Sequence, residues 1–124
     1  MYEISVKDHF AAAHNLRGHK GGCENLHGHN WQVKAVLAAE GLDALGMVCD
    51  FRDVKKALAD VIEGYDHCYL NDLPRFQEAN PTTENIARFI AEALGEKMPR
   101  GVTVRSVTVW ESDNCYARYI VPQE

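Results

Sequence analysis

The chain has 124 residues, of which 46% are hydrophobic and 25% are charged. These are the proportions of one globular domain spanning residues 1–124, and they exclude a disordered or low-complexity chain. With 13 Lys and Arg against 18 Asp and Glu the formal net charge is −5, the wrong sign for binding nucleic acid along the whole surface. We find neither an apolar run of about 18 residues nor the apolar block of a secretory signal, so we expect a soluble, cytoplasmic protein without a membrane partner.

The first third of the chain predicts two strands joined by a loop. Over residues 2–10, apolar and polar residues alternate with the period of two expected of a strand that buries one face. Residues 15–26 contain three glycines and no periodicity, which predicts a loop. Alternation resumes over residues 28–37, which predicts a second strand.

Two helices follow. Apolar residues at helical spacing run from Asp50, a suitable N-cap, to Gly64, and again from about Pro81 to Gly95. Between the helices, residues 65–81 have no clean period and contain two prolines, which is typical of a long ordered loop that carries sites.

The last part of the chain predicts a hairpin, because β-branched runs at 102–111 and 115–121 flank a short turn. The element order is therefore ββααββ. This order favours an α+β fold in which two helices pack on one face of a four-stranded antiparallel sheet.

Histidines cluster near the N-terminus, where five of the six fall within the first 29 residues. His27 and His29 are two positions apart at the start of the second predicted strand, so their side chains point to the same face. His14 lies just past the end of the first predicted strand, which a sheet can bring alongside. Three neutral imidazoles with an open fourth position are typical of a catalytic zinc site. The alternative is that these are ordinary polar loop histidines.

Cys23 precedes His27 by four residues, and the spacing leaves its role open. As a fourth ligand, the thiolate would close the metal site and make it structural. As an unligated neighbour of a zinc ion, the thiol would ionise more readily and could serve as a base near neutral pH.

Two further groups are candidates for chemistry. Asp66 directly precedes His67 in the long loop, and an aspartate beside an imidazole can orient it for proton transfer. Glu111 ends an apolar strand, where it is either exposed or free to accept two parallel N–H bonds from a planar amidine-like edge. A solvated loop pair is the alternative for Asp66 and His67.

Short motifs in register extend through almost the whole chain. They are FAAAH at 10–14, CENLHGHN at 23–30, DF at 50–51, DHCYLN at 66–71, NPTTEN at 80–85 and a closing strand that ends in Glu111. In this order they resemble the 6-pyruvoyl-tetrahydropterin synthase family, and more closely its small bacterial-type branch, 6-carboxytetrahydropterin synthase.

The resemblance implies a tunnelling fold whose sheets form a barrel in a trimer, with two trimers stacked into a homohexamer and sites between subunits. It implies Zn²⁺ as the cofactor and a pterin triphosphate as the substrate. It also implies a role for each candidate residue: His14, His27 and His29 as zinc ligands, Cys23 as the catalytic base, Asp66 and His67 as a proton relay, Glu111 as the anchor of the pterin 2-amino and N3 edge, and Thr82 and Thr83 as contacts to the ring.

The implied reaction converts 7,8-dihydroneopterin triphosphate to 6-carboxytetrahydropterin with release of acetaldehyde and triphosphate, a step of queuosine biosynthesis. The near alternative is 6-pyruvoyl-tetrahydropterin synthase, which eliminates triphosphate and keeps the side chain as a diketone. The distant alternative is a non-catalytic binding module in which Cys23 closes a zinc site. A thiol hydrolase built on Cys23 and His67 is weaker, because it leaves the histidine cluster unexplained.

Overall fold

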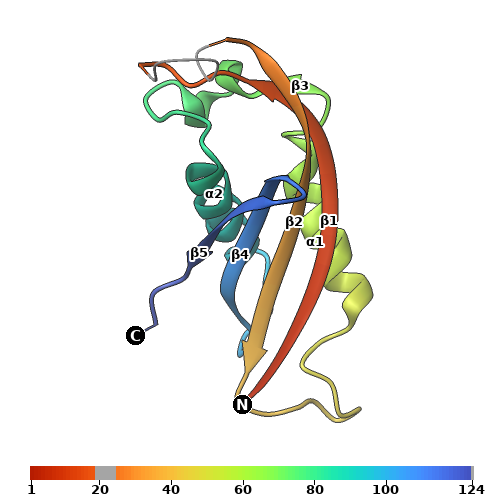
Figure 1. Ribbon diagram of the computed structural model, residues 1–124. Helices are drawn as coiled ribbons and strands as arrows, with labels where there is room; N and C mark the ends of the chain where they lie inside the picture. The colour runs from red at the N-terminus through yellow and green to blue at the C-terminus, as the bar shows by residue number, and fades with distance from the viewer. Residues whose placement is uncertain (19–24, 124) are drawn as a thin grey trace.

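The structure is a computed structural model that describes residues 1–18 and 25–123 (Figure 1). The described part contains long strands, one very short strand, two helices, and two 3-10 turns at Leu70–Asp72 and Pro74–Phe76. In chain order the strands and helices are β1 (Tyr2–His14), β2 (His27–Ala39), α1 (Phe51–Glu63), β3 (Cys68–Tyr69), α2 (Thr83–Gly95), β4 (Thr103–Ser112) and β5 (Cys115–Ile120).

One mixed sheet holds these strands in the order β3-β1-β2-β4-β5. The four long strands are antiparallel neighbours, as the sequence predicts. The predicted count of four strands is incomplete, because Cys68–Tyr69 adds a fifth strand that runs parallel to β1 within the segment predicted as a loop. A two-residue strand is too short for an alternating pattern to show in the sequence.

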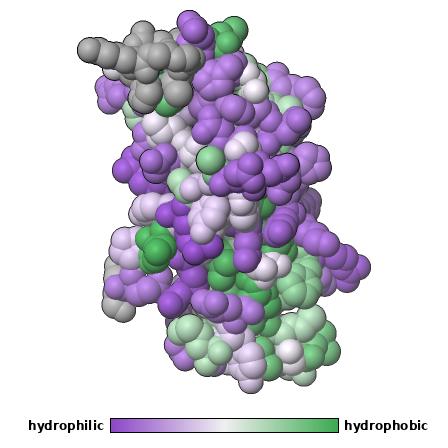
Figure 2. Space-filling view, viewed as in Figure 1, coloured by the Kyte–Doolittle hydropathy of each residue, from purple (hydrophilic) through white to green (hydrophobic). Residues whose placement is uncertain are grey.

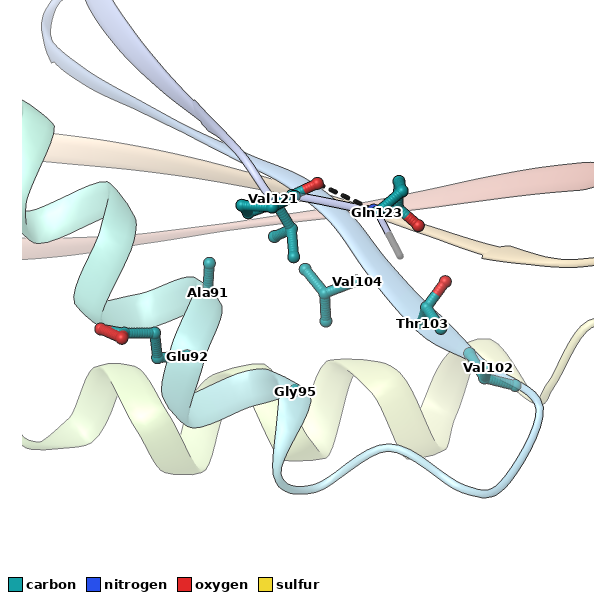
Figure 3. A pocket seen from close by; sticks show the side chains of 9 residues that line it. Ala91, Glu92, Gly95, Val102, Thr103, Val104, Val121 and Gln123 are labelled. Carbon is teal, nitrogen blue, oxygen red and sulfur yellow. Dashed lines mark hydrogen bonds between the residues drawn. The ribbon is translucent and has the colours of Figure 1, made fainter.

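Both helices cover the same face of the sheet, which confirms the predicted α+β architecture (Figures 1 and 3). Helix α1 packs against β1, and α2 packs against β4 and β5. The apolar stripe of each helix meets the inward-facing positions of the strands. The core between the two layers includes Val6, Phe10, Trp31, Val33, Val107 and Val109 from the sheet and Val54, Leu58, Ile62, Ile86, Ile90 and Leu94 from the helices.

Both helices begin where the sequence predicts. The Asp50 carboxylate accepts a hydrogen bond from the Arg52 backbone N–H at 2.8 Å, which caps α1. The Thr82 hydroxyl oxygen accepts from the Asn85 N–H at 3.1 Å, which caps α2. The second cap fixes the segment just before α2, and this segment borders the site described below.

Strand β1 is longer than its predicted range of 2–10. It pairs with β2 from Tyr2↔Ala39 to His14↔His27, so His14 is the last residue of the strand rather than a residue beyond its end. The three consecutive alanines at 11–13 give no alternation of polar and apolar residues, which explains why the sequence pattern stops early. The extension places His14 directly opposite His27.

A cavity of about 510 Å³ lies between the last turns of α2 and the segments that begin β4 and follow β5 (Figure 3). Ala91, Val104 and Val121 line it. This cavity is at the opposite end of α2 and β4 from the histidines. In Figure 2, hydrophilic residues dominate the end of the molecule away from the N-terminus, and hydrophobic residues gather toward the end that carries it. Neither helix in the described ranges is long and apolar enough to cross a membrane.

Candidate metal centre

The three predicted zinc ligands come together on the helix-covered face of the sheet. His14 on β1 lies opposite His27 on β2, and His29 lies two residues further along β2. The ring centroid of His14 is 4.5 Å from that of His27 and 5.3 Å from that of His29. Beneath them is the fully buried Trp31, whose ring contacts His14 and His29 edge-on. The predicted convergence of the three imidazoles is present within a single chain.

Backbone carbonyls fix the orientation of two of the rings. His14 Nδ1 is 2.8 Å from the Pro81 carbonyl oxygen, and His27 Nδ1 is 2.7 Å from the Asn25 carbonyl oxygen. A carbonyl can only accept a hydrogen bond, so each Nδ1 carries the proton and each Nε2 presents a lone pair. This arrangement of an imidazole held by a carbonyl behind it is typical of metal-binding histidines.

Glu111 completes the cluster from β4. Its Oε1 lies 3.4, 3.9 and 2.8 Å from the Nε2 atoms of His14, His27 and His29. A β-bulge between Trp110 and Ser112 lies at this point of the strand. The sequence analysis leaves Glu111 either exposed or bound to a planar ligand edge; its side chain is in fact one-third exposed and adjoins the histidines.

Within the described ranges, no Lys or Arg side chain forms an ion pair with Glu111 in this cluster. No described residue completes a hydrogen bond to the buried Nε2 atoms of His14 and His29, although Glu111 lies beside them. Burial lowers the pKa of His29, and the neighbouring His14 and His27 lower it further, against the opposing effect of the Glu111 carboxylate. Lone pairs and a carboxylate oxygen therefore face one another, all within 4.8 Å. This group of His14, His27, His29 and Glu111 can hold a metal ion.

Two asparagine side chains hold the chain beyond the end of β1. Asn71 accepts a hydrogen bond from the Asn15 N–H at 3.0 Å and donates one to the Asn15 carbonyl at 2.9 Å. Asn80 makes the same two bonds with Arg17, at 3.0 and 2.9 Å. Each amide takes the place of a neighbouring strand residue. We call Asn71 and Asn80 the amide clamp.

The amide clamp is tied to the metal centre through Pro81. Asn80 precedes Pro81, and its own carbonyl accepts a hydrogen bond from the Asn85 side chain at 2.9 Å. The N-cap at Thr82 holds the other side of the proline. The Pro81 carbonyl, which fixes His14, is therefore anchored from both directions.

The Asp66–His67 pair forms as predicted but lies elsewhere in the chain. Asp66 Oδ1 is 2.9 Å from His67 Nδ1 and accepts a hydrogen bond from the Ala11 N–H at 2.9 Å. The hydrogen bond from the Ala11 N–H lowers the pKa of Asp66 most, and the contact with His67 lowers it further. The carboxylate therefore stays ionised and can orient the imidazole. Asp66 also lines a hollow beside Asp8 and Asp60, outside the histidine cluster, and the His67 side chain is 81% exposed. A single chain does not bring this pair to the metal centre.

Of the remaining predicted site residues, one lies outside the described ranges. That residue is Cys23, the predicted base. Thr83 Oγ1 donates a hydrogen bond to Glu111 Oε2 at 3.5 Å, while Thr82 caps α2. Both threonines thus border the centre, and their contact with a pterin ring stays a prediction.

The family model described as 6-pyruvoyl tetrahydropterin synthase matches residues 3–121. The chain belongs to this family. Membership agrees with the sequence resemblance and with the position of the histidines.

Individual members of the 6-pyruvoyl tetrahydropterin synthase family are similar over nearly their whole length. A Synechocystis protein named 6-carboxy-5,6,7,8-tetrahydropterin synthase is 36% identical over 128 residues, covering 99% of this chain and 96% of its own. A Pyrococcus furiosus protein named dihydroneopterin monophosphate aldolase is 36% identical over 110 residues, covering 89% and 90%. The solved Caenorhabditis elegans 6-pyruvoyl tetrahydropterin synthase has a TM-score of 0.88 and 30% identity, covering 98% and 96%.

Three residues that orient or border the histidine cluster were not predicted from the sequence. Asn71, Asn80 and Pro81 occur in the motifs that carry the resemblance, but no role was inferred for them. A signal was available, since two asparagines and a proline in a long loop without periodicity indicate side chains that replace backbone partners.

We expect Asn80→Ala to weaken zinc binding about tenfold, the lower end of what is lost when groups that orient ligands are removed. The variant removes both hydrogen bonds between the Asn80 side chain and the Arg17 backbone. The neighbouring Pro81 carbonyl, which bonds to His14, then loses its fixed direction. Competition with a chelating indicator measures the affinity. Gln123→Ala is the control, because the Gln123 side chain donates its hydrogen bond to the Val121 carbonyl, beside the cavity at the other end of the sheet. Equal zinc affinity in Asn80→Ala and the parent would show that the clamp does not act on the centre.

Proposed function

We propose that this chain is a zinc-dependent 6-carboxy-5,6,7,8-tetrahydropterin synthase of the queuosine and 7-deazaguanine pathway. Its substrates would be 7,8-dihydroneopterin triphosphate and one water molecule, which the carbon–carbon cleavage consumes, and its products 6-carboxytetrahydropterin, acetaldehyde and triphosphate. The observation that carries the proposal is the convergence of three imidazole Nε2 atoms, two of them with their tautomer fixed by a carbonyl. Membership in the family supports the substrate class.

The donor set fits zinc. Zn²⁺ favours nitrogen donors in tetrahedral geometry, and three histidines leave one position for substrate or water. The buried Nε2 atoms of His14 and His29, which lack hydrogen bonds from the described residues, are satisfied by such an ion. When bound, zinc supplies the positive charge that polarises the side-chain hydroxyls of the substrate and acidifies the adjoining carbon.

The chain's own groups would move the protons. Cys23, as a thiolate, would take a proton from the substrate side chain, and His67, oriented by Asp66, would deliver or collect the second proton. Electrons then shift from side chain to ring within one molecule, so no redox cofactor is needed. Asp66 is suited to its role because hydrogen bonds from Ala11 and His67 keep it ionised.

Glu111 would bind the 2-amino and N3 edge of the pterin, with Thr82 and Thr83 against the ring. The carboxylate is one-third exposed, so an incoming ligand can reach it, and Thr83 holds its Oε2. Two parallel N–H donors on the pterin edge match the two oxygens of a carboxylate. The short distance to His29 also allows the carboxylate to act as a fourth metal ligand.

Glu111→Ala separates these two roles. An unpaired pterin edge in a water-poor pocket costs about 1–3 kcal/mol, so we expect KM to rise roughly tenfold to hundredfold while the zinc content stays at that of the parent. Steady-state kinetics and metal analysis on the same sample make the measurement. Unaltered kinetics would discard the anchoring role, and loss of zinc would identify Glu111 as a ligand instead.

We further propose a homohexamer of two trimers with each site between subunits. The separation of Asp66 and His67 from the histidines within one chain supports this, because a relay on a neighbouring subunit can supply what one chain lacks. Strand β5 supports it too, since it forms one edge of the sheet and exposes Tyr116 and Ile120. Pairing of sheet edges between subunits, as in a barrel, would cover such an edge.

The test of the proposed function is product identification. Purified zinc-loaded protein is incubated with 7,8-dihydroneopterin triphosphate and, in a separate reaction, with 7,8-dihydroneopterin monophosphate. The products are separated and identified by mass spectrometry. Acetaldehyde with 6-carboxytetrahydropterin supports the proposal. A diketone that keeps all side-chain carbons identifies a 6-pyruvoyl synthase, and turnover of the monophosphate alone identifies an aldolase activity. If the protein binds zinc but turns over neither substrate, it is a non-catalytic binding module.

A further inference from the structure

The sheet face opposite the helices carries a row of cations. Lys7, Lys34, Thr108 and Arg118 lie opposite one another in successive strands β1, β2, β4 and β5. Their neighbours along the strands, among them Val6, Val33 and Val107, point into the core, so the row points away from the helices. We call Lys7, Lys34 and Arg118 the cation row.

This arrangement is electrostatically unfavourable by itself. Lys7 and Lys34 are directly paired across adjacent strands, and like charges in that position destabilise a sheet. Within the described ranges, none of the three cations forms an ion pair, and the carboxylate on this face, Glu3, is 3.9 Å from a different cation, Arg105. The chain as a whole has a net charge of −5. A concentration of unpaired positive charge on an acidic protein indicates an anionic ligand.

Arg118 and Lys7 contact aromatic rings, and Arg118 and Lys34 line a hollow. Arg118 Nε donates a hydrogen bond to Thr108 Oγ1 at 2.9 Å, and its guanidinium carbon lies 5.4 Å from the centre of the Tyr116 ring. Lys7 Nζ lies 5.7 Å from the centre of the Trp110 ring. A hollow of about 350 Å³ adjoins the row. Its polar lining is Lys34, Arg118, Ser106 and Thr108 together with the Glu3–Arg105 ion pair.

We propose that this face binds the phosphate chain of a polyphosphate anion. Neighbouring strands are about 4.8 Å apart, so a row that crosses four strands spans roughly 14 Å, too far for a single phosphate to contact every cation. A linear chain of several phosphates can reach all three. Lysines serve such a ligand as point charges, the guanidinium of Arg118 keeps its terminal N–H groups for a bidentate contact, and serine and threonine hydroxyls add neutral donors.

This site is separate from the metal centre. His14, His27 and His29 point to the helix-covered face, and the cation row points to the other. The inference therefore does not depend on the proposed catalytic function.

The experiment measures binding of inorganic triphosphate by calorimetry at low and moderate salt. We expect the full-length protein to bind it with an affinity that falls as salt rises. The variant Lys7→Gln/Lys34→Gln should lose at least tenfold in affinity. The matched control Lys55→Gln/Lys56→Gln, on the exposed side of α1, removes the same charge and should change affinity by less than twofold. Removing the Lys7–Lys34 repulsion should leave the thermal midpoint unchanged or higher, which shows that the variant is folded.

Three comparisons test whether the cation row binds the phosphate chain. Equal affinity in the row variant and the parent, or an equal loss in the Lys55/Lys56 control, would overturn the proposal. Loss of binding in His27→Ala with retention in the row variant would place the triphosphate at the metal centre and overturn it as well. ATP and inorganic triphosphate are then compared: equal affinities support recognition of the phosphate chain alone, as in a free polyphosphate, and tighter binding of ATP supports a nucleotide as its source.

Discussion

Replacing His27 with alanine is expected to remove zinc from the protein and to lower turnover at least about a thousandfold, since a Lewis-acidic ion contributes several kcal/mol to such a transition state. His27 is the informative ligand to remove. Its side chain is 29% exposed, whereas that of His14 is 2% exposed, so the variant leaves no large void in the core. Metal analysis of the purified variant by mass spectrometry gives the zinc content, and the product assay gives the rate.

His9→Ala is the control for His27→Ala. His9 lies on β1, but its side chain is 84% exposed and is not part of the metal group. The His9→Ala variant should keep the zinc content and the turnover of the parent. A zinc content in His27→Ala equal to that of the parent would refute the assignment of the ligands.

Cys23→Ala should keep the full zinc content and lose turnover by about 10²–10⁴-fold, which is the usual contribution of a positioned acid or base. The reason is that a base acts on the substrate without holding the metal. Metal analysis and single-turnover rates on one preparation give both values. Cys115→Ala, which removes an exposed free thiol, should change neither. If Cys23→Ala lacks zinc, Cys23 is a metal ligand, and the site is closed and structural rather than catalytic.

The sequence predicted the convergence of the three histidines better than it predicted the strand that carries His14. His27 and His29 share a face because the period of a strand is two, and a spacing of two residues shows this without knowledge of the fold. His14 was placed near them correctly but beyond the strand, because Ala11, Ala12 and Ala13 carry no contrast between a buried and an exposed face. Only the pairing of His14 with His27 in the sheet shows that the strand continues.

The supports of the site could not be predicted in the same way. The direction of the Pro81 carbonyl depends on the Thr82 cap and on Asn80, whose side chain bonds to Arg17, 63 positions away in the chain. Glu111 faces the histidines at a β-bulge, and strand periodicity alone does not locate bulges. The Asp66–His67 pair was predicted from adjacency and is present, but adjacency says nothing about which part of the molecule, or which subunit, the pair serves.

X-ray absorption at the zinc edge tests the central claim most directly, because it reports the atoms bound to the ion. The account predicts three imidazole nitrogens at about 2.0–2.1 Å, an oxygen ligand in the remaining position and no sulfur. A zinc–sulfur distance of about 2.3 Å, or fewer than three imidazoles, would contradict it.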